Sequence, residues 1–265
     1  MEHDHMIEML DLDAEVLADY HRELIGWVGR EAADHPRVVD IGAGSGTGSL
    51  ALARELPGSE ITAVDVDPEM LAHLRDQAAK TGLGDRIRTV EADLDQPWPD
   101  LGPADVVWAA SSMHHMADPK QALASAYAAL REGGLLVIAE LDSFPLFLTG
   151  TADEEVERRG HEAVAHLRHE AGMHMHENWG DRATHAGFEA VTRRHFDIDL
   201  RPPLPAAAAR YAEVTLHRMR ERLEGRLSTS DLTALDKAVA GLAGRDDLSV
   251  RTTRTVWLAR RGRFV

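Results

Sequence analysis

The sequence contains no cysteine among its 265 residues. This absence excludes disulfide bonds, thiolate metal sites and cysteine nucleophiles. Long apolar runs are also missing, since no stretch approaches the roughly 20 apolar residues of a membrane-spanning helix. The N-terminal segment MEHDHMIEMLDLDAEVL has neither the basic start nor the apolar run of a secretory signal. We therefore expect a cytoplasmic protein with no membrane partner.

Positive charge is scarce, with 29 Lys and Arg against 45 Asp and Glu and a net charge of -16. Because affinity for nucleic acids depends on neutralising phosphates, this balance predicts no nucleic-acid partner. Residues 191–265 differ from the rest in having more Lys and Arg than Asp and Glu. The arginines there either pack on the acidic remainder of the chain or bind an anionic substrate.

Short runs rich in β-branched residues alternate with amphipathic stretches between residues 37 and 141. This alternation predicts parallel strands joined by helical crossovers. Five strands are expected, at residues 37–41, 61–65, 87–91, 104–109 and 135–141. Asp67-Pro68 and Asp118-Pro119 each combine a capping residue with a proline and predict helix starts. The helix that begins after Asp118 is expected to end at Gly133-Gly134.

The remaining chain is expected to be mainly helical. Helices are predicted at 150–172 and near 179–186, followed by strands at 190–200 and 253–260. The segment between these strands is too long for a hairpin loop, and its apolar spacing predicts two helices, at 212–227 and 232–242.

We predict three parts of the chain. An N-terminal helical lid, residues 1–36, contains a helix near Ala14 to Gly29. An α/β domain is formed by residues 37–201 and 248–265, and a helical insert by residues 202–247. Lid and insert are expected to form a cap over an acceptor pocket. Packing of these helices in a homodimer contact is the alternative.

A glycine-rich turn, Asp40-Ile41-Gly42-Ala43-Gly44-Ser45-Gly46-Thr47-Gly48, joins the first strand to the next helix. Such a turn lets the backbone approach a ligand and directs amide N–H groups at it. By itself the turn is a weak signal that nicotinamide, flavin and S-adenosylmethionine binders share. Asp65 closes the second strand 19 residues after Gly46, where a carboxylate can accept both hydroxyls of a ribose. Asp93 follows the third strand at the same edge of the sheet.

Four segments, VVDIGAGSGTG, ITAVDVDPEML, RTVEADL and ADVVWAASSMHHM, resemble in this order the successive motifs of class I S-adenosylmethionine-dependent methyltransferases. The resemblance covers about residues 37–141. It implies a doubly wound α/β fold with a mostly parallel seven-stranded sheet whose last strand is antiparallel. It also implies S-adenosylmethionine as the cofactor and methyl transfer to an oxygen, carbon or nitrogen atom of a small-molecule acceptor.

The resemblance further implies roles for individual residues. Asp40 would organise the glycine loop and the amino end of the cofactor, and Asp65 would hold its ribose hydroxyls. The other implied contacts are Gly42 and Gly44 beneath the methionine and ribose parts, Val66 beside the adenine, Asp93 and Leu94 at the adenine amino group and ring edge, and the carbonyl of Ala109. As alternatives, Asp40 and Asp93 would be ordinary turn residues.

Two other functions stay open at this point. An NAD(P)-dependent oxidoreductase would use the glycine loop and Asp65 nearly as well, although the sequence has no Tyr-x-x-x-Lys pair and Asp40 is typical of the methyltransferase loop. A non-catalytic S-adenosylmethionine-binding protein would carry the same motifs.

Candidates for acting on the acceptor follow strands four and five. Histidine titrates near neutral pH, so His114 is predicted to position or deprotonate the acceptor, with His115 as the adjacent alternative. Glu140 is the second catalytic candidate. The histidines between 161 and 176 do not share one helix face, and we predict no metal site.

Overall fold

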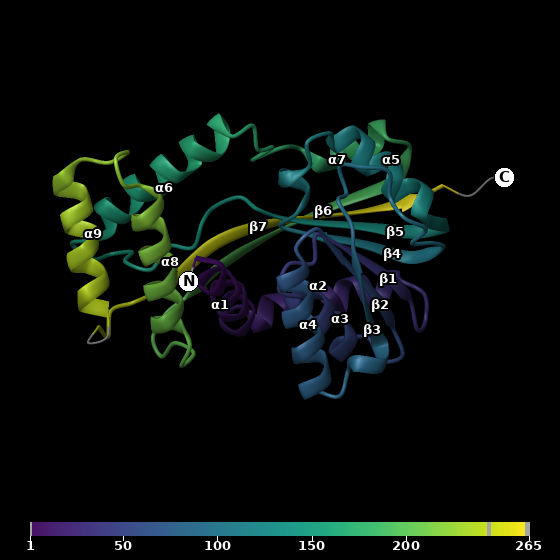
Figure 1. The fold of residues 1–265 in the computed structure, drawn as a ribbon, viewed down its shortest axis with the longest axis horizontal. Coiled ribbons are helices and arrows are strands. Elements are labelled where there is room, and N and C mark those ends of the chain that lie inside the picture. Colours follow the sequence, from purple (N-terminus) through teal and green to yellow (C-terminus); the bar gives the residue numbers. More distant parts are fainter. Residues whose placement is uncertain (1, 243–244, 263–265) are drawn as a thin grey trace. The chain divides into compact units, whose positions relative to one another are not determined.

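The computed structural model describes residues 2–242 and 245–262 (Figure 1). The strands are β1 Arg37–Ile41, β2 Glu60–Asp65, β3 Ile87–Glu91, β4 Ala104–Ala110, β5 Leu130–Leu141, β6 Phe188–Leu200 and β7 Val250–Arg261. The α-helices are α1 Glu2–Val16, α2 Ala18–Glu31, α3 Thr47–Glu55, α4 Pro68–Lys80, α5 Pro119–Ala129, α6 Glu154–Glu170, α7 Trp179–His185, α8 Ala208–Arg222 and α9 Thr229–Gly241. Two short 3₁₀ helices are η1 Gly84–Arg86 and η2 Met113–His115.

The strands form one seven-stranded sheet in the order β3-β2-β1-β4-β5-β7-β6. Strands β1 to β5 pair in parallel, and β7 is antiparallel to β5 and β6. The expected doubly wound, mostly parallel sheet with an antiparallel last strand is confirmed. Strand β1 lies between β2 and β4, so the direction of winding reverses there. Open α/β sheets bind their ligands at the carboxyl ends of the strands beside such a reversal.

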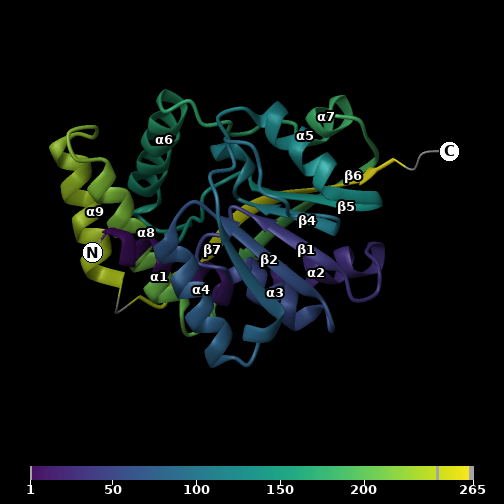
Figure 2. The same cartoon turned by 45° about the vertical axis from the view of Figure 1, so that its right-hand side comes forward.

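The chain divides into two compact units. Unit 2 consists of residues 18–140, 176–196 and 255–265. Within unit 2, helices α2, α3 and α4 cover one face of the sheet, and α5 and α7 cover the other (Figures 1 and 2). Its core is built from β-branched residues of the strands and large aromatic side chains, among them Val39, Ile41, Val107, Trp179 and Trp257.

Both proline-marked helix starts in unit 2 are confirmed. The Asp67 carboxylate accepts the backbone N–H groups of Glu69 and Met70 at the start of α4. The Asp118 carboxylate does the same for residues 120 and 121 at the start of α5. In each helix the proline takes a position whose N–H would have no partner inside the helix.

Unit 1 consists of residues 1–17, 141–175 and 197–254. Its helix α8 packs against α1, α6 and α9. Leu216 and Leu235 are fully buried, which confirms the apolar spacing that predicted two helices in the insert. The buried Glu157 carboxylate accepts the N–H groups of Phe147 and Leu148 at 2.8 Å each. That these helices cap an acceptor stays a prediction. Among the helices that the structure describes, none has the length and apolar character of a membrane span.

Two predicted helix boundaries are wrong. Helix α5 ends at Ala129, not at Gly133-Gly134, and β5 already begins at Leu130 because Leu130 pairs with Ala104 of β4. Gly133 lies inside this strand with a φ of 74°. The single helix expected near Ala14 to Gly29 is two helices, α1 and α2, separated at Leu17.

Candidate active site

The glycine-rich turn between β1 and α3 takes a backbone conformation that requires glycine. Gly42, Gly44 and Gly46 have φ values of 67°, 54° and 85°, in the left-handed region that side chains disfavour. A Cβ atom on Gly42 would lie 2.6 Å from the Cβ of Ser112, and one on Gly46 would lie 2.2 Å from Leu74 Cδ1. The turn is therefore left-handed, and its glycines pack tightly against Ser112 and Leu74.

Asp65 fixes this turn from the end of β2. One carboxylate oxygen accepts the N–H of Gly44 at 2.8 Å, and the other accepts the N–H of Asp67 at 2.9 Å. The side chain is half-buried. Val66 follows it and is 63% exposed. Among the described residues, it is the large hydrophobic side chain that is exposed to solvent. A tethered carboxylate and an uncovered apolar side chain thus lie next to each other at the sheet edge.

Asp40 is buried beneath the same turn. Its carboxylate accepts the Ser49 hydroxyl at 2.7 Å, and a Cβ atom on Gly48 would lie 3.4 Å from it. Burial raises the pKa of Asp40 from 3.8 to about 7, the Ser49 hydrogen bond lowers it, and the charge of Asp65 raises it. The carboxyl group therefore changes its protonation state near neutral pH.

The residues predicted to contact the adenine lie at the same edge of the sheet, where Asp93 and Leu94 form hydrogen bonds with residues nearby in the sequence. Asp93 is exposed, and its carboxylate accepts the N–H of Asp95 at 3.0 Å, as in an ordinary turn. Leu94 is buried, and its carbonyl accepts the indole N–H of Trp98 at 3.0 Å. Ala109 is buried within β4. Their contact with a cofactor stays a prediction.

His114 and Glu140 form a buried pair between the ends of β4 and β5. The His114 side chain is 3% exposed, and its Nδ1 lies 2.6 Å from Glu140 Oε2. The backbone N–H of His114 also donates to Glu140 Oε1, at 3.3 Å. His115 is exposed, with its ring centroid 4.3 Å from that of His114. The structure therefore brings the two predicted catalytic residues together, with the Glu140 carboxylate at Nδ1 of the His114 ring.

Three serines around the turn were not among the predicted site residues. Ser49 binds Asp40, and the buried hydroxyls of Ser45 and Ser112 have no hydrogen-bond partner among the described residues. Buried polar groups are rarely left unsatisfied, so such hydroxyls commonly mark a place for water or a ligand. The signal in the sequence was the small polar residues that follow the glycines and strand β4.

Comparison with known proteins assigns the central part of the chain. Residues 39–136 match a family described as a methyltransferase domain. A demethylmenaquinone methyltransferase from Thermus thermophilus is 38% identical over 110 residues, 41% of this chain and 49% of that protein. A 27-O-demethylrifamycin SV methyltransferase from Amycolatopsis mediterranei is 33% identical over 161 residues, 57% of either chain. The chain thus spans about half the length of these curated relatives.

A solved structure supports the fold across nearly the whole chain. It is a phosphoethanolamine N-methyltransferase from Haemonchus contortus in complex with phosphomonomethylethanolamine and S-adenosylhomocysteine. It is 20% identical, covers 91% of this chain and 52% of its own, and has a TM-score of 0.53. The matched methyltransferase domain, the order of the four motifs and the strand order agree, and together they indicate a class I S-adenosylmethionine-dependent methyltransferase domain in this part of the chain.

Proposed function

We propose that this protein transfers the methyl group of S-adenosylmethionine to a small-molecule acceptor. The observation that carries the proposal is the left-handed glycine turn held by the Asp65 carboxylate at the carboxyl edge of the sheet. The names of two relatives specify a demethylmenaquinone and a demethylrifamycin as their acceptors, which supports an acceptor of small size.

The residues around the turn fit this cofactor. Asp65 presents a carboxylate, which is the group that accepts ribose hydroxyls, and the exposed Val66 offers an apolar surface to an adenine face. Gly42 and Gly44 carry no Cβ atom, so the main chain can lie directly against a ligand. When bound, the cofactor supplies an electrophilic methyl group on a sulfonium centre. The protein's task is to hold the acceptor in line with that methyl group and to keep water away.

His114 would deprotonate or orient the acceptor in this proposal. Glu140 engages Nδ1 of the ring, so Nε2 is the nitrogen that would accept a proton from an acceptor hydroxyl. The carboxylate at Nδ1 then stabilises the charged ring. For a carbon or amine acceptor, the same fixed ring would orient the nucleophile.

The first experiment is isothermal titration calorimetry with S-adenosylhomocysteine and, separately, NADH. The wild-type chain should bind S-adenosylhomocysteine in the micromolar range, about -8 kcal/mol, and Asp65→Ala should abolish measurable binding. Asp76→Ala removes an exposed carboxylate of α4 in the same unit and serves as the matched control. Binding of NADH without binding of S-adenosylhomocysteine would overturn the proposal in favour of an oxidoreductase.

The second experiment screens acceptors by the release of S-adenosylhomocysteine. With an active acceptor, His114→Ala should lower turnover by roughly 10²-fold or more, while cofactor affinity stays the same and the melting temperature falls because the buried Glu140 carboxylate loses its partner. His115→Ala, which changes the exposed neighbour, should keep most of the activity. If turnover survives His114→Ala, His114 has a structural role at the end of β4 and no role in catalysis. Cofactor binding without turnover on any acceptor would favour a non-catalytic binding protein.

A further inference from the structure

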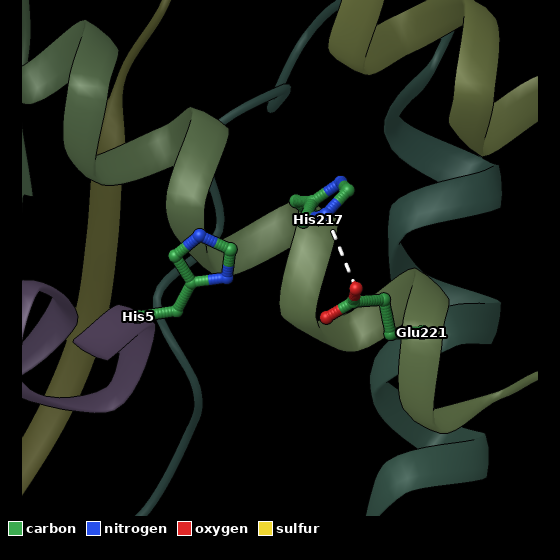
Figure 3. A group of neighbouring side chains, drawn as sticks. All are labelled: His5, His217 and Glu221. Atoms are coloured by element: carbon green, nitrogen blue, oxygen red, sulfur yellow. Dashed lines mark ion pairs between the residues drawn. The ribbon is translucent and has the colours of Figure 1, made fainter. Parts of the chain in front are cut away.

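Two histidines and a glutamate gather on two helices of unit 1 (Figure 3). His5 lies on α1, and His217 and Glu221 lie one turn apart on α8. One ring nitrogen of each histidine and one carboxylate oxygen of Glu221 all lie within 4.8 Å of one another. The side chains of His217 and Glu221 are 48% and 50% exposed, so an ion can reach them from solvent.

We propose that His5, His217 and Glu221 bind a divalent transition-metal ion with the preferences of zinc. Imidazole nitrogen and carboxylate oxygen are the ligands that zinc takes in proteins without cysteine. Two nitrogen ligands disfavour magnesium and calcium, which prefer oxygen ligands throughout. This proposal departs from the prediction of no metal site, which rested on the spacing of the histidines between 161 and 176.

The distances allow coordination after a small movement of one side chain. Zinc bonds of about 2.0–2.1 Å in a tetrahedron place neighbouring ligand atoms about 3.3–3.4 Å apart. His217 Nε2 and Glu221 Oε1 are already 3.3 Å apart. The rings of His5 and His217 meet edge to face, with their centroids 5.8 Å apart, so one ring must turn to direct its nitrogen at the ion. In Figure 3 the His5 ring extends from α1 toward the His217–Glu221 pair on α8.

An ordinary ion pair is the competing explanation, and the chain contains a matched example. His166 and Glu170 on α6 are also four residues apart, with Nε2 and Oε1 at 3.2 Å, and are 69% and 44% exposed. Among the residues that the structure describes, a third ligand completes only the group on α1 and α8. The two pairs thus share helix spacing, distance and exposure. They differ in the presence of His5 beside the first pair and of Arg226, which donates to Glu170 at 3.1 Å, beside the second.

Metal binding here would join two helices whose ligands are 212 positions apart in the sequence. The three ligands come together only when α1 packs on α8, so the ion binds the folded unit and stabilises that packing. Three protein ligands leave at least one coordination position for water. The role we assign is a structural link between the N-terminal helix and the insert.

The test titrates the full chain, without a polyhistidine tag, with Co²⁺ alone and follows its visible absorption, and then displaces Co²⁺ with Zn²⁺. The wild type should bind one Co²⁺ per chain. His5→Ala and His217→Ala should each weaken binding by at least about tenfold, and Glu221→Gln should weaken it too. His166→Ala should bind as the wild type does. Circular dichroism verifies that each variant is folded.

Thermal unfolding gives an independent readout. Zn²⁺ should raise the melting temperature of the wild type and of His166→Ala, and should leave that of His5→Ala unchanged. The proposal is overturned if the wild type binds no Co²⁺, if His5→Ala and His217→Ala bind it as tightly as the wild type, or if His166→Ala weakens binding as much as they do.

Discussion

Replacing Asp40 with asparagine is predicted to change how the stability of this protein depends on pH. Asp40 is 3% exposed, and burial raises its pKa from 3.8 to about 7. In the unfolded chain the carboxyl group returns to its ordinary pKa. Between the two pKa values the unfolded state binds fewer protons than the folded state does. The free energy of unfolding should therefore fall as pH rises from about 4 to about 7, and level off above that.

The size of the effect follows from the shift. Each pKa unit corresponds to 1.36 kcal/mol, so the move from 3.8 to about 7 amounts to about 4 kcal/mol above neutral pH. Asparagine cannot ionise and avoids this loss, and its oxygen can still accept the Ser49 hydroxyl. Its buried amide donors lack acceptors at a cost of about 1–3 kcal/mol. Asp40→Asn should thus destabilise the protein by about 1–3 kcal/mol at pH 4 and stabilise it by about the same amount at pH 8.

Thermal unfolding of the wild type and Asp40→Asn is followed by circular dichroism between pH 4 and pH 8. It shows whether the order of stability of the two proteins reverses in this range. Ser49→Ala is the companion variant, because it removes the hydrogen bond that lowers the Asp40 pKa. The pH range over which the stability of Ser49→Ala falls should extend to higher pH. A difference between wild type and Asp40→Asn that stays constant across this range would refute the argument from burial.

Two further predictions concern the turn and the buried pair. Gly42→Ala should abolish binding of S-adenosylhomocysteine in calorimetry, because the new Cβ would lie 2.6 Å from Ser112 Cβ at a φ of 67°. Gly172 has a φ of 73°, and a Cβ atom there would have no atom within 4 Å, so Gly172→Ala should cost about 1–2 kcal/mol of stability and leave binding intact. An equal loss of S-adenosylhomocysteine binding in the two variants would contradict the packing argument. Glu140→Gln should lower turnover by about 10²-fold without changing cofactor affinity, since the His114 ring loses its anionic partner, and unchanged turnover would count against the pair.

Local signals in the sequence were enough for most of the α/β core. Asp67-Pro68 and Asp118-Pro119 each contain their capping chemistry within four residues, so no distant contact is needed to start the helix. The end of α5 was different. The glycines at 133 and 134 are typical of a helix end, but the pairing of Leu130 with Ala104 places them in a strand. A contact across 26 positions decided that boundary.

Most members of the candidate site were predictable, the three serines around the turn excepted, but their contacts were not. The motifs contain Asp40, Asp65 and His114, and Glu140 was indicated by its place at the end of the fifth predicted strand. The bond between His114 and Glu140 exists because β4 and β5 are neighbours in the sheet, and spacing alone does not give that order. The raised pKa of Asp40 depends on how completely the turn and Ser49 cover it. Burial in three dimensions, which a linear pattern does not contain, determined both.

The tethering of the Asp65 carboxylate determines which nucleotides the proposed cofactor site would accept. A carboxylate has about four acceptor positions, and here the N–H groups of Gly44 and Asp67 take one on each oxygen. The group therefore cannot rotate away from an incoming ligand. Ribose hydroxyls can donate to the remaining positions, whereas a phosphate ester on the same ribose would place two anions against each other. With the ribose held by Asp65 as proposed, the turn would discriminate against 2′-phosphorylated dinucleotides by electrostatic repulsion that is set when the chain folds.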